Sequence, residues 1–427
     1  MNTVCQDSSS THTPFWEFFF FALGLSLSTN VINIARIGTV NISLAQTIVI
    51  FMSVCLLFKR ISLVRVWASL KVSFRAWLVV VLLSFFALFI NSVFNLSSSF
   101  FAGLIELVSV MLAIVLIANM PQYCMTIQKG MVWGLFINVV VSLLSFFKWR
   151  LTGSAINFGE LFGLDSYAFY GTPTYFRTQG LFTESSYFIC YLCVTTPIAL
   201  LLKPVKIIDN KVLLALSIIA VALSLSGNIV IYFLELLFCL RYEIMHRHVR
   251  VLKAINVVAF FLFVGAAAVF LYFFGGVENY WSKIQLGFQG ANLVDESNAP
   301  RLENMKAAVS FIKKSNYLGF GYNMGATVMS ANSIEHAGAA STFLRMILDL
   351  GVLGGIAYIW IFYQYCVHDF FSKNASIYKK ALAYGMVGLF ACQVSNGYPF
   401  ASVLTMTMLA LVACKETETI QEELCEK

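Results

Sequence analysis

The chain has 427 residues, of which 59% are hydrophobic, 15% aromatic and only 11% charged, with a formal net charge of +7. A soluble domain carries about 25% charged residues, so this chain lacks the polar groups to cover a globular surface of its own size. The composition excludes a soluble enzyme and a disordered protein. Because the basic residues lie between long apolar runs, the net charge does not indicate a nucleic-acid partner. The sequence predicts a polytopic membrane protein.

Runs of roughly 20 apolar residues predict spanning helices. About twelve such segments follow one another, which predicts an all-α fold with two long outer loops. The expected helices cover 15–34, 39–58, 77–94, 98–119, 131–147, 183–202, 212–226, 228–240, 254–274, 341–366, 381–397 and 399–414.

These helices divide the chain into seven parts. The expected parts are a cytoplasmic tail 1–14, helices one to five over 15–147, a first periplasmic loop 148–182, helices six to nine over 183–274, a large periplasmic loop 275–340, helices ten to twelve over 341–414 and a cytoplasmic tail 415–427. Most Lys and Arg residues fall in short connections that this order assigns to the cytoplasm, as the positive-inside rule requires.

The large outer loop contains a further helix at 299–315. Asn298 is a suitable cap, and Leu302, Met305, Val309 and Ile312 form an apolar stripe. Such a helix can lie on the outer membrane surface. It ends at Lys313-Lys314 and is followed by a turn, Gly319-Phe-Gly321.

Motifs for nucleotide or metal chemistry are absent from the sequence. There is no P-loop, no histidine pair at helical metal spacing and no Asp-x-Asp pair. Cys190-x-x-Cys193 lies within an apolar helix without a second pair, so we interpret it as packing. We expect neither a metal nor a cofactor, and any chemistry must use isolated residues that the fold brings together.

Three outer-face residues are candidates for a site. Arg177 precedes the sixth helix, where a guanidinium can bind phosphate bidentately or extend to lipid headgroups. Arg301 begins the loop helix and is either a phosphate ligand or simply solvated. His336 is either a general base or an incidental loop residue.

Four further charged residues lie in predicted helices. Arg345 and Asp349 are four residues apart, which suits a structural ion pair or a site. Glu106 and Glu235 are isolated acids within apolar helices, so each should face the bundle interior as a cavity or packing group, or as part of a proton pathway.

Four stretches resemble motifs of the O-antigen polymerase and O-antigen ligase superfamily of bacterial glycan-assembly enzymes. They are Arg177-Thr-Gln-Gly-Leu-Phe-Thr-Glu184, the break Ser224-Leu-Ser-Gly-Asn228, the helix from Arg301 to Gly319-Phe-Gly321, and His336 with Asp349-Leu-Gly-Val-Leu-Gly354. The chain departs from the pattern at Ser185-Ser186, where Pro-Asn is common, and after His336, where Asn is common. Gly227-Asn228 stands where ligases frequently have Arg, which favours a polymerase.

The resemblance implies an inverting glycosyltransferase of the bacterial inner membrane with its active site facing the periplasm. Its donor would be a glycan on undecaprenyl diphosphate and its acceptor another lipid-linked repeat unit. The implied diphosphate ligands are Arg177, Arg301, Lys313 and Lys314, and the implied base is His336 or Glu184. Besides the lipid-linked oligosaccharide and the bilayer, a chain-length regulator is a candidate partner. An O-antigen ligase and a repeat-unit flippase remain the alternatives; a flippase should have short outer loops and duplicated halves.

Overall fold

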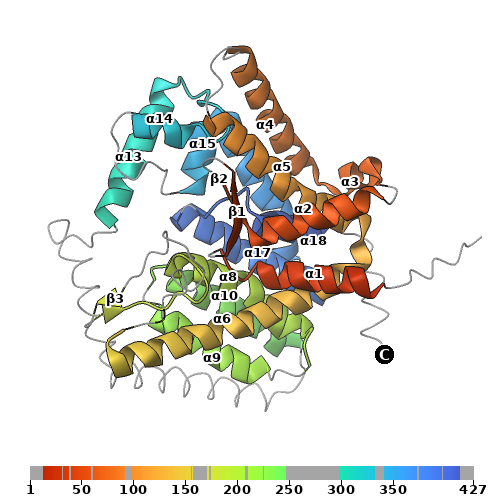
Figure 1. Ribbon diagram of the computed structural model, residues 1–427, viewed down its shortest axis with the longest axis vertical. Coiled ribbons are helices and arrows are strands. Elements are labelled where there is room, and N and C mark those ends of the chain that lie inside the picture. The colour runs from red at the N-terminus through yellow and green to blue at the C-terminus, as the bar shows by residue number, and fades with distance from the viewer. Residues whose placement is uncertain are drawn as a thin grey trace, which may run out of the picture.

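The structure is a computed structural model in which most of the described residues are helical (Figure 1). The described residues are 13–30, 32–37, 40–58, 61–91, 98–154, 156, 171–172, 175–206, 210–224, 226–246, 298–331, 341–372, 375–396 and 398–413. The predicted helix 254–274, residues 1–12 of the first tail, the tail 415–427, the centre of the first outer loop and His336 lie outside them.

The first two predicted helices are shorter than expected because a β-hairpin separates them. Helix α1 spans Pro14–Ser26, strands β1 (Asn33–Ile37) and β2 (Val40–Ser43) pair antiparallel, and α2 spans Leu44–Leu57. The predicted helical ranges 15–34 and 39–58 are therefore wrong over the hairpin. Asn, Val, Ile and Thr dominate this stretch and favour extended backbone. Ser43 then begins α2 through a reciprocal capping box with Gln46.

The next helices include a short one that the sequence pattern did not predict. Helix α3 (Leu63–Ser69) joins α4 (Val72–Asn91) through a bend of 115°. Helix α5 spans Ser98–Asn119, as predicted, and α6 spans Cys124–Thr152, so it extends beyond the predicted 131–147 at both ends. A short 3-10 turn at Pro121–Tyr123 precedes α6, and α6 packs along α1 (Figure 1).

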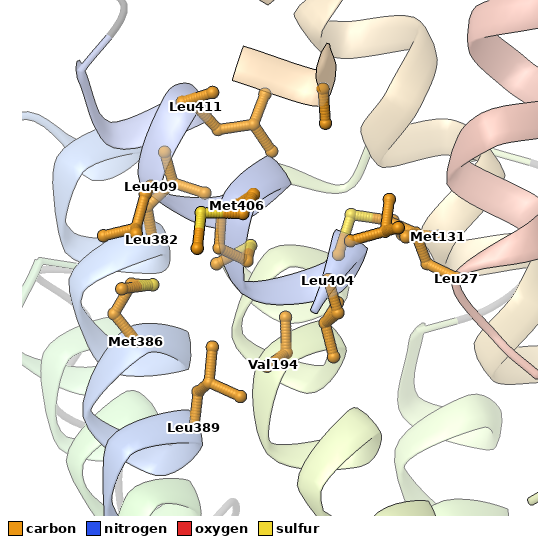
Figure 2. Packing of buried hydrophobic residues seen from close by; sticks show 14 of the residues in the cluster. Leu27, Met131, Val194, Leu382, Met386, Leu389, Leu404, Met406, Leu409 and Leu411 are labelled. Atoms are coloured by element: carbon orange, nitrogen blue, oxygen red, sulfur yellow. The ribbon is translucent and has the colours of Figure 1, made fainter. Parts of the chain in front are cut away.

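The centre of the fold is formed by α8, α17 and α18. Helix α8 (Ser185–Pro197) continues as a π-helical segment, Ile198–Leu202, and all of α8 except Tyr187 is buried. Helix α17 (Ile377–Asn396) packs beside α8, and α18 (Val403–Ala413) packs on α5 and α17. Figure 2 shows Leu382, Met386 and Leu389 of α17 next to Val194 and Met406. Helices apolar on every side belong inside a bundle.

Two helices and a small hairpin flank this centre. Helix α9 spans Asn210–Leu223 and α10 spans Ile229–His246, near the predicted 212–226 and 228–240. Strands β3 (Gly171–Thr172) and β4 (Tyr175–Phe176) pair antiparallel just before Arg177. The ring of Phe176 stacks on Trp149 of α6 at 5.6 Å, which fixes the chain entering Arg177.

The loop helix is α13 (Asn298–Lys314), in agreement with the predicted 299–315. It and α14 (Gly325–Ala331) pack on the start of α15 through Ala308, Phe311, Met329 and Leu348. Helix α15 spans Thr342–Phe362 and leads through a π-helical segment, Tyr363–Val367, into α16 (His368–Phe371). The predicted helix 341–366 is present, but Gly351 interrupts it with φ 70° and ψ −168°.

Within the described residues, three helical segments are long and apolar enough to cross a membrane: Pro121–Thr152, Ser185–Leu202 and Thr342–Phe371. A fourth span results if the bent pair α3 and α4 counts as one. Further apolar helices of 10–17 residues, such as α2 and α9, pack among them. The chain is thus a helical protein with several apolar spans.

Candidate functional site

The Gly-rich turn after α13 packs directly into the break of α15. The Phe320 and Gly321 amides donate to the carbonyls of Leu348 and Asp349 at 3.0 and 2.8 Å, and the Val352 amide donates to Tyr317 O at 3.0 Å. A helix interruption leaves such backbone groups without intrahelical partners. The turn supplies those partners, so two stretches that lie thirty residues apart form one unit.

Only glycine fits where these two segments meet. Gly319 and Gly351 both have positive φ, and a Cβ on Gly351 would lie 2.5 Å from Tyr317 O. A Cβ on Gly319 would lie 2.4 Å from the Gly351 amide nitrogen. The glycines therefore allow close backbone approach, and this approach places Asp349 beside the residues that follow the turn.

Asp349 connects α15 to the start of α14. Its side chain is buried, its Oδ1 accepts a hydrogen bond from the Gly325 amide at 2.7 Å, and its Oδ2 lies 3.6 Å from Arg345 Nε. Arg345 in turn donates from a terminal nitrogen to Asn323 Oδ1 at 2.5 Å. The guanidinium is consequently held on two sides by groups of the same small region.

A second carboxylate approaches Arg345 from α5. Glu106 and Asp349 both lie close enough to Arg345 to interact with it electrostatically, and Tyr322 and Tyr187 lie near the same guanidinium. Helix α5 approaches Asn323 closely at Gly103, which has no side chain. A Cβ on Gly103 would lie only 2.9 Å from Asn323 Cβ. We call Glu106, Tyr322, Asn323, Arg345 and Asp349 the Arg345 cluster. It joins one cation, two acids and two neutral polar groups.

Tyr322 is the neutral hydroxyl of this cluster. Its amide donates to Ser84 Oγ of α4 at 2.8 Å, and its ring is buried against Trp77 and Phe85. Burial raises the pKa of the Tyr322 hydroxyl; Glu106 and Asp349 raise it further, whereas Arg345 opposes them. The hydroxyl therefore stays protonated and can donate a hydrogen bond.

The Arg345 guanidinium retains donor capacity for a further group that carries oxygen atoms. A guanidinium has five N–H donors in a planar fork, and contacts to Asp349 and Asn323 use only part of that capacity. About a third of the Arg345 side chain, 34%, is exposed. The guanidinium is thus oriented by Asp349 and Asn323, and part of the Arg345 side chain is exposed.

The segment from Arg177 to Glu184 is fixed by backbone and side-chain hydrogen bonds. Arg177 Nε donates to Ser224 O at 3.3 Å, and the Thr178 hydroxyl donates to Ala220 O at 3.0 Å. The Leu181 amide donates to Asn138 Oδ1 of α6 at 2.8 Å. Arg177 therefore lies at the break between α9 and α10, so two of the resembling stretches are in contact.

Glu184 immediately precedes α8. It occupies the N-cap position, but its Oε2 accepts a hydrogen bond from the Ser186 hydroxyl at 2.8 Å instead of capping the backbone. The side chain is partly exposed. Glu184 therefore lies at the positive end of the α8 dipole.

Tyr187 and the end of α17 connect these two regions. Tyr187, one turn after Glu184, interacts with Arg345, and its ring contacts that of Tyr398 edge to face at 5.2 Å. Tyr398 O accepts from the Thr342 hydroxyl at 2.6 Å, and Ser395 Oγ donates to Asn228 Oδ1 at 2.9 Å. The starts of α8, α10 and α15 thus meet at one end of the bundle.

The remaining predicted site residues are not brought into this contact network by the described structure. Lys313 and Lys314 are exposed at the end of α13, with the Lys314 ammonium 4.6 Å from the centre of the Phe311 ring. Arg301 lies in the first turns of α13, and its side chain and His336 lie outside what the structure describes. Glu235 is buried beside Cys193, apart from the Arg345 cluster.

Sequence reasoning missed Glu106 as a member of the site. The available signal was an acid within an apolar helix, which is costly unless it is paired or faces a cavity. Nothing in its spacing indicated Arg345 as a neighbour, because the two residues are more than two hundred positions apart in the chain.

A different set of basic residues lies at the other end of α15. Lys71 Nζ donates to Gln364 O at 2.6 Å, and Lys380 Nζ donates to Phe370 O at 2.7 Å. The part of α15 after the break at Gly351, together with the π-helical segment, separates these basic residues from the Arg345 cluster.

The chain was also compared with known proteins. No protein-family model matches it, and no curated protein matches it either.

Proposed function

We propose that this protein is an O-antigen polymerase of the bacterial inner membrane with about twelve spanning helices. It would transfer a growing glycan from undecaprenyl diphosphate to a sugar hydroxyl of another lipid-linked repeat unit. The observation that carries the proposal is the meeting of resembling stretches that are distant in sequence: Arg177 contacts the Ser224 break, the Gly319 turn packs into α15, and Tyr187 lies near Arg345.

The chemistry requires charge stabilisation and one proton transfer. The acceptor oxygen bonds to the anomeric carbon, the bond from that carbon to the diphosphate oxygen breaks, and the electron pair leaves with undecaprenyl diphosphate. The acceptor hydroxyl loses its proton to a base. Because the leaving group is already activated, the protein must mainly position both substrates and stabilise the diphosphate.

The described residues suggest a division of roles. Arg345 and Arg177 are the guanidinium groups suited to the diphosphate, with Arg301, Lys313 and Lys314 of α13 as further candidate cations. Glu184, partly exposed at the start of α8, is the candidate base among the described residues, and His336 is the other candidate. Asp349 is a positioning residue, since it contacts Arg345 and the Gly325 amide.

The same assignment fixes an orientation in the membrane. The end with Lys71 and Lys380 would face the cytoplasm, as the positive-inside rule favours, and the Arg345 cluster would face the periplasm. Reporter fusions near residues 165 and 300 should then signal the periplasm, and fusions near 65, 206, 247 and 376 the cytoplasm. A cytoplasmic signal at 300 would contradict the proposal.

A deletion strain tests the function. Loss of a polymerase leaves surface lipid with a single repeat unit, loss of a ligase leaves none, and loss of a flippase also prevents display of the unit. We expect single-unit caps in the deletion strain and a full ladder when the wild-type gene is restored. Absence of any cap would favour ligase or flippase instead.

Arg345→Lys tests the site within that strain. Lysine keeps the positive charge but loses the planar fork. Loss of charge-assisted hydrogen bonds worth about 1.5–3 kcal/mol should slow polymerisation by about 10- to 100-fold at unchanged protein abundance. Arg150→Lys, at the exposed end of α6, is the matched control and should give a normal ladder. A normal ladder with Arg345→Lys would remove Arg345 from the site.

A further inference from the structure

The segment around α3 contains several exposed apolar side chains. Within these few residues the exposed fractions reach 90% for Phe58, 71% for Leu63 and 80% for Val64. Trp67 and Val72 are also exposed, whereas Val66 and Leu70 are buried against the bundle. We call Phe58, Leu63, Val64, Trp67 and Val72 the α3 apolar patch. One side of this short helix therefore packs on the protein while the other remains uncovered.

The direction of α3 differs from that of the neighbouring span. The bend between α3 and α4 is 115°, which exceeds a right angle by 25°. If α4 crosses the membrane upright, α3 lies nearly parallel to the membrane surface. Hydrogen bonds at both ends hold α3 on the bundle. The Ser62 amide donates to Asn119 Oδ1 at 3.0 Å, and the Lys71 amide donates to the Tyr365 hydroxyl at 3.1 Å.

The charged residues along the segment that carries the α3 apolar patch have one sign. From residue 57 to 75 the sequence contains five basic residues and no Asp or Glu; the basic residues are Lys59, Arg60, Arg65, Lys71 and Arg75. Arg65 is exposed, and the Arg75 guanidinium lies 5.3 Å from the centre of the Trp67 ring. An apolar surface bordered by basic groups and a tryptophan is complementary to a leaflet with anionic headgroups.

We propose that α3 is an in-plane membrane anchor that binds anionic phospholipid headgroups at the end of the bundle carrying Lys71 and Lys380. The α3 apolar patch enters the acyl region just below the headgroups, while Arg65 and Arg75 contact lipid phosphates. A helix of seven residues is too short to be stable alone in water, so its contacts with Asn119 and Tyr365 preform the lipid-binding surface. The proposal requires a membrane location but not the polymerase activity.

Photo-crosslinking of the full-length protein tests where the patch lies. A benzophenone amino acid replaces Val64, and the protein is reconstituted in vesicles of phosphatidylcholine with phosphatidylglycerol. Illumination should add the mass of one phospholipid to the peptide containing residue 64. An adduct with another protein chain, or no lipid adduct, would contradict the proposal.

A second measurement tests the headgroup preference. Each basic residue near an anionic surface contributes about 1 kcal/mol, a factor of about five in affinity. Arg65→Gln should therefore reduce the phosphatidylglycerol retained in native mass spectra about fivefold, and Arg65→Gln with Arg75→Gln about 25-fold. The control Arg150→Gln, at the end of α6, should leave retention unchanged. Equal retention by all variants would overturn the headgroup assignment, whatever the outcome of the glycan assays.

Discussion

Replacing Gly351 with alanine tests the joint between the Gly-rich turn and α15. Gly351 has φ 70° and ψ −168°, a conformation that only glycine adopts without strain. Strain of this kind costs about 1–3 kcal/mol. In addition, the new Cβ would lie 2.5 Å from Tyr317 O and 2.6 Å from Leu318 C, both of them backbone atoms. The turn must therefore move away from α15.

Two other glycines separate the effect of backbone strain from the effect of steric overlap by the new Cβ. Gly153, which ends α6, also has φ 70°, but a Cβ there would meet nothing within 4 Å. Gly227 would likewise meet nothing, and its φ is not in the left-handed region. Gly153→Ala should therefore cost about 1–2 kcal/mol through strain alone. Gly227→Ala should be neutral or slightly stabilising, and Gly351→Ala should cost more than Gly153→Ala.

Thermal unfolding of the three purified variants in one detergent gives the comparison. The melting temperature should fall most for Gly351→Ala, less for Gly153→Ala and not at all for Gly227→Ala. Polymerisation should also fall with Gly351→Ala, because Asp349 and Arg345 follow the position of the turn. If Gly351→Ala is as stable and active as Gly227→Ala, the packing of the turn into α15 is wrong.

Three further substitutions address other contacts. Asp349→Asn keeps an acceptor for the Gly325 amide but removes the charge opposite Arg345. We expect this variant to make shorter glycan chains while its melting temperature stays within a few degrees of wild type. Unchanged chain length would contradict a positioning role for Asp349. Asn138→Ala removes two donated hydrogen bonds, to Ser28 O and Gly134 O, and one accepted from the Leu181 amide. The free energy of unfolding should fall by about 2–4 kcal/mol. A fall below about 1 kcal/mol would show that these hydrogen bonds are dispensable. Glu235→Gln should retain both stability and activity, because the carboxyl forms no ion pair with the described residues; loss of activity at normal abundance would assign Glu235 to a proton pathway.

Long apolar segments could be predicted well from sequence. The predicted helix 98–119 coincides with α5, and the amphipathic stripe at 299–315 identified α13. In both cases the pattern is local: an uninterrupted apolar run in one, a 3.6-residue period in the other. The same reasoning failed over the β1–β2 hairpin and at α3, where short segments take their structure from tertiary contacts such as the one between Ser62 and Asn119.

The candidate site was only partly predictable for a related reason. Arg345 and Asp349 can be paired from their spacing alone. Arg177 is a candidate from its residue type and its place before a helix, and Glu184 from the resemblance. Asn323 and Glu106 could not be added, because their contacts with Arg345 depend on the packing of α5 and of the turn before α14. The positive φ of Gly351 likewise has no signature that distinguishes it from Gly354 and Gly355.

The most direct test of the proposed function is reconstitution of the purified protein in vesicles with an undecaprenyl-diphosphate-linked repeat unit as the sole substrate. We expect lipid-linked products that differ by one repeat unit each, with release of undecaprenyl diphosphate and with a slower rate for Arg345→Lys. Two results would contradict the assignment as a polymerase. In one, the substrate stays one unit long in the presence of the wild-type protein; in the other, it is consumed only after lipid A–core is added.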